Sequence, residues 1–160
     1  MENKIQFQIK GIFVQEFSIH LKEEFIKADQ ETKDGFRKYI YEVSCLSNAV
    51  IEDSSINLFV DTKVFLDSEK KIELGHLSIV NVFFIKDIEQ YYNQDTKLVN
   101  IPPIAEASIV GISISHSRAI LLAKTAGTFL QNAVLPVLNP QDFLTKSSDE
   151  NNNGIVIANS

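Results

Sequence analysis

INLFVDTKVFLDSEKKIELGHLSIVNVFFIK, from Ile56 to Lys86, is the stretch that decides the fold. The polar DSEKK at 67–71 has the length of a hairpin turn, and Ile72–Lys86 after it holds the dense apolar run IVNVFFI. In the first half, large aliphatic residues recur with the short period of a strand, at Ile56, Leu58, Val60 and Val64. We therefore expect two long strands that pair antiparallel.

Two further strands are predicted before this pair. Apolar residues alternate along Ile5–Leu21, and the phase of the alternation shifts near Gly11, which predicts a β-bulge. A shorter alternation covers Tyr39–Ser44. The segment between them, Lys22–Lys38, is charge-rich, and we expect a mostly exposed connector.

The last third predicts helices and one more strand. Good helix formers favour a helix over Ile104–Ala126, with Gly127 after its end and a break near Gly111. Phe129–Leu135 is typical of a strand, and Asn139-Pro140 of the capped start of a short helix. Strands first and helices later indicate an α+β fold.

The composition bounds the function. The chain has 160 residues, a net charge of −6 and a single cysteine, Cys45. This length suits one domain, the acidity opposes non-specific binding to nucleic acid, and one cysteine excludes an intrachain disulfide. MENKIQFQIK lacks the apolar region of a secretory signal, and no stretch approaches the roughly 20 apolar residues of a spanning helix. We expect a cytoplasmic protein without membrane insertion.

No pattern of catalytic, metal-binding or cofactor-binding residues stands out. Gly111-x-Ser113-x-Ser115 lacks the final glycine of a hydrolase nucleophile elbow. The histidines are His20, His76 and His116, and none has zinc-ligand spacing to another or to the cysteine. No phosphate-binding glycine loop occurs. The sequence therefore predicts a protein that is not an enzyme and needs no cofactor or metal.

Both ends of the chain resemble the SecB family of bacterial export chaperones. The family's opening strand is matched by Phe7-Gln8-Ile9, Phe13 and Glu16-Phe17-Ser18. Its late G-T-F…P-V signature is matched by Gly127-Thr128-Phe129, Leu135-Pro136-Val137, Phe143 and Leu144, although Leu130 replaces the family's proline. Between these ends the order of strands also agrees.

The resemblance implies a fold and an assembly. The fold is a four-stranded antiparallel, Greek-key-like sheet with one long helix and a short C-terminal helix, a SecB-like roll over residues 1–146. The assembly is a homotetramer, a dimer of dimers. The implied function is an ATP-independent holdase that keeps unfolded preproteins translocation-competent for the Sec pathway and passes them to the SecA motor.

Two groups of site residues follow. Apolar residues on strands and on the helical lip would bind clients: Phe36, Tyr39, Tyr41, Val43, Phe65, Phe143 and Leu144. Positions matching the family's SecA-docking surface are Glu16, His20, Leu74 and His76. The positions of His20 and His76 are acidic in the family, and their replacement by histidine weakens the attraction to the cationic tail of SecA.

Alternatives remain open at this point. Tyr39, Tyr41 and Val43 alternate as an ordinary core strand also does. The chain could be a solitary SecB-like chaperone of a toxin–antitoxin or mobile-element system without SecA docking, or a small ligand-binding or enzymatic α+β roll. Residues 147–160 predict a disordered polar tail, with a strand at Gly154–Ala158 as the other reading of its apolar GIVIA.

Overall fold

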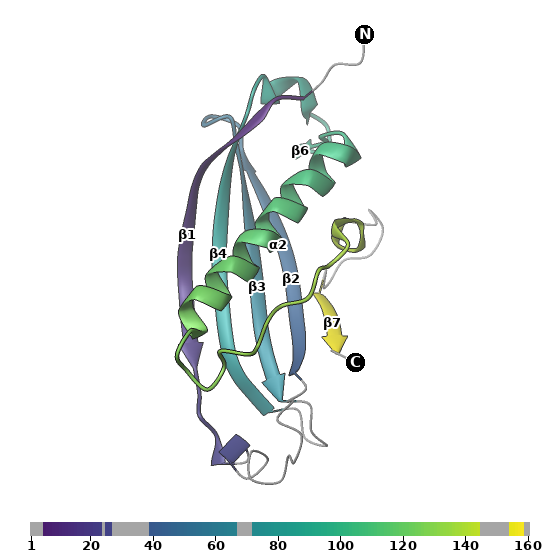
Figure 1. Ribbon diagram of the computed structural model, residues 1–160. Helices are drawn as coiled ribbons and strands as arrows, with labels where there is room; N and C mark the ends of the chain where they lie inside the picture. The colour runs from purple at the N-terminus through teal and green to yellow at the C-terminus, as the bar shows by residue number, and fades with distance from the viewer. Residues whose placement is uncertain (1–4, 24, 27–38, 67–71, 145–153, 159–160) are drawn as a thin grey trace.

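The computed structural model describes residues 5–23, 25–26, 39–66, 72–144 and 154–158. Its main sheet is antiparallel, with strands in the order β1-β4-β3-β2-β7. The strands are β1 (Phe7–Ile19), β2 (Tyr39–Val50), β3 (Ser55–Leu66), β4 (Ile72–Ile85) and β7 (Gly154–Ala158). Strands β1 and β7 therefore form the two edges (Figure 1).

The expected central pair is confirmed. Strands β3 and β4 pair antiparallel from Ser55 opposite Phe84 to Leu66 opposite Ile72, while the connecting residues 67–71 lie outside the described part. Strand β1 pairs with the far side of β4, and its register shifts between Ile9 and Gly11, as predicted, and again between Val14 and Glu16. The order of the first four strands gives the Greek-key arrangement.

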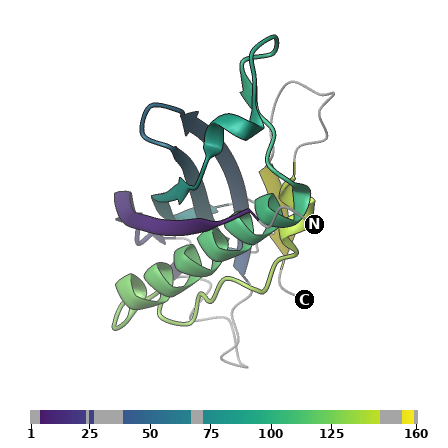
Figure 2. The same cartoon turned by 90° about the horizontal axis from the view of Figure 1, so that it is seen from above.

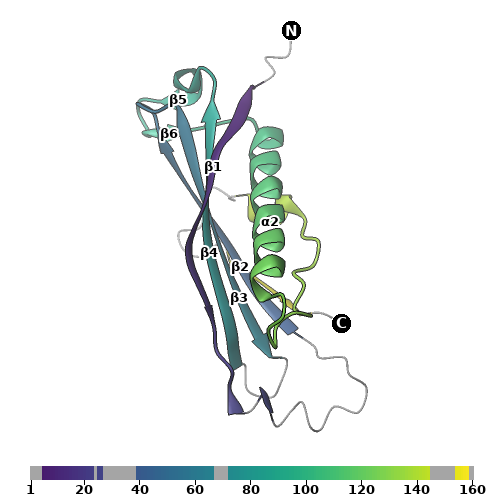
Figure 3. The same ribbon diagram turned by 60° about the vertical axis from the view of Figure 1, so that its left-hand side comes forward.

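One long helix covers a single face of this sheet (Figures 2 and 3). Helix α2 runs from Pro103 to Thr125 without interruption, so the predicted break at Gly111 is wrong. Gly127 follows the helix end with a φ of 74°, the left-handed conformation expected of a C′ glycine. The helix is joined to the sheet by a 2.9 Å hydrogen bond between the hydroxyls of Ser117 and Thr62.

The hydrophobic core lies between α2 and the sheet. Cross-strand neighbours on β2, β3 and β4 face the helix, and their side chains are almost or completely buried: Tyr41, Val43, Val60, Leu77, Ile79 and Phe83. The residues between them on the same strands point to the opposite face of the sheet, and most of these are half-buried. A sheet covered on one side only explains why the sequence alternates rather than running continuously apolar.

Smaller elements join the sheet to the helix. A 3-10 turn, η1 (Ile88–Tyr91), precedes a two-stranded ribbon of β5 (Tyr92–Asn93) and β6 (Leu98–Val99). In the first connector, Phe25 is buried, and its ring lies 4.9 Å from that of Phe129. The predicted exposed connector is thus wrong at Phe25, and residues 27–38 lie outside the described part.

The segment after α2 is not a strand, although Phe129–Leu135 predicted one. It turns locally, with the amide of Ala133 donating to the carbonyl of Leu130 at 2.8 Å, and then crosses back over the core. Leu130, Ala133 and Leu135 are buried, so its apolar residues anchor an irregular chain to the core instead of alternating across a sheet.

The short C-terminal helix is a single 3-10 turn, η2 (Pro140–Phe143). Asn139 caps it as predicted, since its side-chain oxygen accepts a hydrogen bond from the amide of Gln141 at 3.2 Å. Farther on, Gly154–Ala158 forms strand β7 beside β2, where the sequence favoured a disordered tail. The second of the two readings of GIVIA therefore agrees with the structure.

Candidate functional site

Several of the client-binding residues predicted from the sequence lie in the hydrophobic core, which also includes buried residues of the lip, that is, of η2 and the segment before it. Tyr39, Tyr41, Val43 and Phe143 belong to one buried cluster, and Leu144 packs against it half-buried. Phe65 is buried as well but lies outside that cluster. Phe36 lies outside the described residues. In the isolated chain Tyr39, Tyr41 and Val43 are therefore core residues, which is the ordinary interpretation of their alternation.

Tyr41 carries an unusual polar group into this cluster. Its side chain is 0% exposed, and its hydroxyl has no hydrogen-bond partner among the described residues. Burial raises the pKa of the phenol far above its usual range, with a further contribution from Tyr39. Within the described part of the chain the group is thus a neutral donor without an acceptor, which is costly in an apolar environment.

The outer edge of β2 is only partly occupied. Strand β7 pairs with Ile40–Ser44, which is five residues of a strand of twelve. Within the described residues, Cys45–Val50 has no strand beside it on this edge. Leu46 lies in that open half with 69% of its surface exposed. Unpaired backbone groups next to an exposed aliphatic side chain suit an added extended strand.

The lip is held against α2 by two contacts. The guanidinium of Arg118 donates to the carbonyls of Leu135 and Pro136, at 2.8 and 2.7 Å. About two turns earlier in the helix, a Cβ on Gly111 would lie 2.9 Å from Cγ of Pro140. The glycine therefore lets the lip approach the helix closely, and this packing is the structural role of the glycine where a break was predicted.

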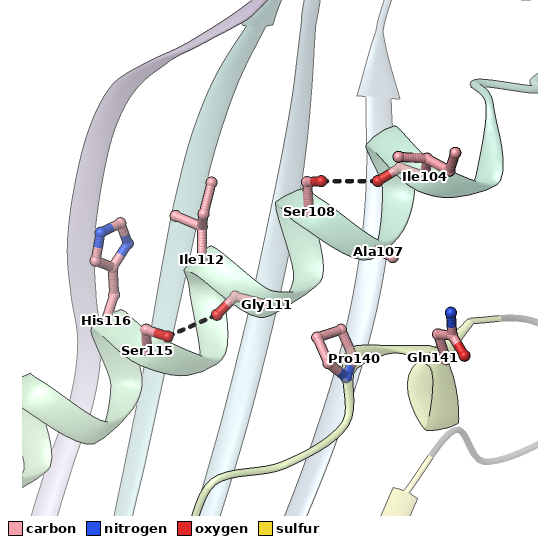
Figure 4. A pocket seen from close by; sticks show the side chains of 9 residues that line it. All are labelled: Ile104, Ala107, Ser108, Gly111, Ile112, Ser115, His116, Pro140 and Gln141. Atoms are coloured by element: carbon pink, nitrogen blue, oxygen red, sulfur yellow. Dashed lines mark hydrogen bonds between the residues drawn. The ribbon is translucent and has the colours of Figure 1, made fainter.

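A shallow groove of about 710 Å³ lies between the outer side of α2 and the lip (Figure 4). It is lined by Ile104, Ala107, Ser108, Gly111, Ile112, Ser115, His116, Pro140 and Gln141. The hydroxyls of Ser108 and Ser115 donate to helix carbonyls one turn earlier, at 2.7 and 2.8 Å. The Gly111–Ser115 motif thus lies inside a helix and not at the strand-to-helix turn that a nucleophile elbow requires.

Of the four predicted SecA-docking positions, the structure brings two together on the open face of the sheet. His76 lies between two carboxylates, with Nε2 2.6 Å from Asp61 and Nδ1 3.3 Å from Glu16. Burial lowers the pKa of His76, but the hydrogen bonds and charges of Asp61 and Glu16 outweigh it and raise the pKa overall. The sequence did not predict that Asp61 belongs to this charged group, because the alternation along β3 indicates only that a polar residue at this position faces outward.

The other two positions differ from each other. His20 is exposed just after β1, and its amide donates to the carbonyl of Leu74 at 2.8 Å. Leu74 is 0% exposed and belongs to the core. A partner at this surface would therefore meet the charges of Glu16, His76 and Asp61, and not an apolar side chain at position 74.

Comparison with known proteins supports the fold. No family model matches the sequence, and no curated protein matches it either. Among solved structures, the chain is similar to the SecB-like chaperone Rv1957 of Mycobacterium tuberculosis, in a complex with a ChAD peptide from the HigA1 antitoxin Rv1956. The two chains are 11% identical, and the TM-score is 0.54 over 82% of this chain and 90% of that one.

This similarity confirms the predicted α+β, SecB-like fold, while membership of the SecB family stays a prediction. Across the described residues, no helix combines the length and apolar character needed to cross a membrane. Those residues also contain no group of three His, Cys, Asp or Glu side chains suited to a metal ion.

Proposed function

We propose that this protein is an ATP-independent holdase chaperone that binds extended apolar segments of unfolded proteins. The observation that carries the proposal is the outer edge of β2, which already pairs with one extended segment and, among the residues that the structure describes, has no strand beside Cys45–Val50. The fold similarity to a SecB-like chaperone in complex with a peptide supports it. Clients would add a strand to this edge, and the exposed Leu46 beside it would contribute an apolar contact.

The physical basis of client selection is accessible backbone and apolar area. A client strand supplies hydrogen bonds to β2, and burial of about 300 Å² of apolar surface contributes roughly 7 kcal/mol before the entropy of ordering the client is subtracted. A folded protein has no free extended segment to offer. Preference for unfolded chains therefore needs neither a sequence motif nor nucleotide hydrolysis.

Self-association would cover apolar surface that the isolated chain leaves open. On β1 the exposed residues include Ile9, Ile12, Phe13 and Val14, at 41, 39, 57 and 43%. Such a row on an edge strand favours a partner of the same kind. The homotetramer is part of this proposal, and sedimentation equilibrium at micromolar concentration tests it, because a monomer would contradict it.

Delivery to SecA in the Sec pathway is the finer part of the proposal and rests on the sequence resemblance. The imidazole of His76 already engages the carboxylate of Glu16, so a cationic tail must compete with it for that carboxylate. We expect weak retention of the zinc-bearing SecA tail in a pull-down, and stronger retention by a His20→Glu, His76→Glu double variant. Equal retention by both proteins would argue against docking at this surface.

The holdase activity itself is tested by light scattering. Guanidinium-denatured citrate synthase is diluted into buffer with or without stoichiometric protein and without nucleotide, and we expect suppressed aggregation. Leu46→Lys places a charge beside the open half of β2, and losing burial of one leucine weakens client binding about 5- to 30-fold, or roughly 1–2 kcal/mol. Leu21→Lys, at a residue 57% exposed near the end of β1, is the matched control. No protection by the unaltered protein would end the proposal.

A further inference from the structure

Strand β7 occupies part of the edge that the proposed function assigns to clients. Its residues pair antiparallel with β2, from Gly154 opposite Ser44 to Ala158 opposite Ile40. It also lies in contact with η2, the tip of the lip (Figure 1). While β7 is paired, this half of the β2 edge is closed to any other strand.

The sequence of β7 has the features expected of a bound segment. GIVIA at 154–158 is apolar and rich in β-branched residues, and the polar SSDENNN precedes it at 147–153. A segment that adds to a sheet edge is typically short, extended and apolar. Its backbone supplies the hydrogen bonds, and its alternate side chains supply the contacts. The segment thus resembles the clients proposed above more than it resembles the long strands of the sheet.

The pairing is short for a permanent strand. Strands β1 to β4 span 12 to 14 residues each, whereas β7 spans five. The other edge strand, β1, pairs with β4 along nearly its whole length. Few ladder bonds hold β7, so its release costs far less than the release of any other strand in this sheet.

Its attachment to the same chain compensates for this weakness. The nine residues 145–153 separate the described part of the lip from β7, and a connection of this length spans at most about 30 Å. A segment joined in this way is present at its site at an effective concentration on the order of 1 mM. A weak strand can therefore occupy the edge most of the time and still be displaced.

We propose that Gly154–Ala158 is an intramolecular occupant of the client-binding edge of β2, which an extended apolar client segment displaces. The inference rests on the proposed function, since it names the regulation of the same site. In this arrangement β7 covers the backbone of β2 at Ile40–Ser44 when no client is present. A longer client would begin to pair at Cys45–Val50. Pairing then proceeds along β2 as β7 leaves.

The size of the effect follows from competition. If the segment bound β2 with an intrinsic Kd of about 0.1 mM, an effective concentration of about 1 mM would keep it in place about 90% of the time. A competing segment would then bind the full chain about 10-fold more weakly than a chain lacking β7.

The experiment compares the full chain with a chain ending at Asn153. The probe is a fluorescently labelled peptide, NNNGIVIANS, identical to residues 151–160, and binding is followed by anisotropy. We expect about 10-fold tighter binding to the shortened chain, together with loss of amide hydrogen-exchange protection at Ile40–Ser44 that the added peptide restores. A double variant of the full chain, Ile155→Pro and Val156→Pro, removes a ladder donor whichever of the two amides faces β2, and should reproduce the shortened chain. A chain ending at Ala158 keeps β7 and is the control.

The outcomes separate the two proposals. Equal peptide affinity for the full and shortened chains, or no binding to either, overturns the inference about β7. If in that case both chains protect denatured citrate synthase equally, the holdase proposal stands without it. Tighter peptide binding by the shortened chain, with no protection of citrate synthase by either, keeps the occupant role of β7 and ends the holdase proposal.

Discussion

Tyr41→Phe should stabilise the protein, although it removes a polar group from a well-packed position. The side chain is 0% exposed, and its hydroxyl has no hydrogen-bond partner among the described residues. Phenylalanine keeps the ring and its packing in the core cluster while removing only the hydroxyl. The free energy of unfolding should rise because the folded state no longer buries an unsatisfied donor.

The magnitude can be worked from this environment. A buried unsatisfied hydroxyl costs about 1–3 kcal/mol, and the small void left by the oxygen subtracts part of that gain. We expect a net increase of about 1–2 kcal/mol, which for a chain of this size raises Tm by about 2–8 °C.

Urea unfolding followed by circular dichroism measures the change directly. The midpoint should move to higher urea while the m-value stays constant, since the surface exposed on unfolding is unchanged. Tyr92→Phe, at a half-buried position on the β5–β6 ribbon, serves as the control and should leave the midpoint unchanged. A Tyr41→Phe variant less stable than the unaltered protein would show that the hydroxyl has a partner, and the reasoning would be refuted.

Three further predictions concern the sheet face and the lip. Because the folded pKa of His76 is raised, its ion pairs stabilise the fold fully below the unfolded pKa of about 6.5 and are lost as pH rises through the folded pKa. The free energy of unfolding should therefore fall as pH rises through this range, and His76→Gln should flatten the curve. Gly111→Val should push Pro140 away and cost about 1–3 kcal/mol in urea unfolding, whereas Ala123→Val at an exposed helix position should cost much less. Arg118→Met should cost about 2–3 kcal/mol by losing both carbonyl contacts, with faster hydrogen exchange in the lip, and unchanged exchange there would contradict its anchoring role.

Several features were predictable because neighbouring residues encode them. The alternation in residues 56–86 predicted β3 and β4, and the phase shift near Gly11 predicted a bulge that lies where expected. Gly127 and Asn139 predicted a helix end and a helix start, because a left-handed φ and an N-cap each depend on one or two residues. The SecB-like fold followed from these elements together with the resemblance at both ends.

Errors arose where a local pattern had more than one tertiary solution. Phe129–Leu135 has strand composition, yet its apolar residues pack on the core from an irregular chain. Gly111 is a weak helix former, yet α2 continues through it because the lip packs against it. In both segments, contact with a distant part of the chain outweighed the local preference.

The candidate site shows the same division. The sequence by itself determined the apolar alternation of β2, the charged positions Glu16 and His76, and the isolated GIVIA segment near the end. Only the tertiary structure decided that Asp61 joins the two charged side chains, that Tyr41 and Val43 are buried in the core, and that GIVIA pairs with β2 more than a hundred residues earlier. The physical reason is that caps and strand periods depend on the nearest neighbours, whereas burial, ion pairing and edge pairing depend on which distant segments the folded chain brings together.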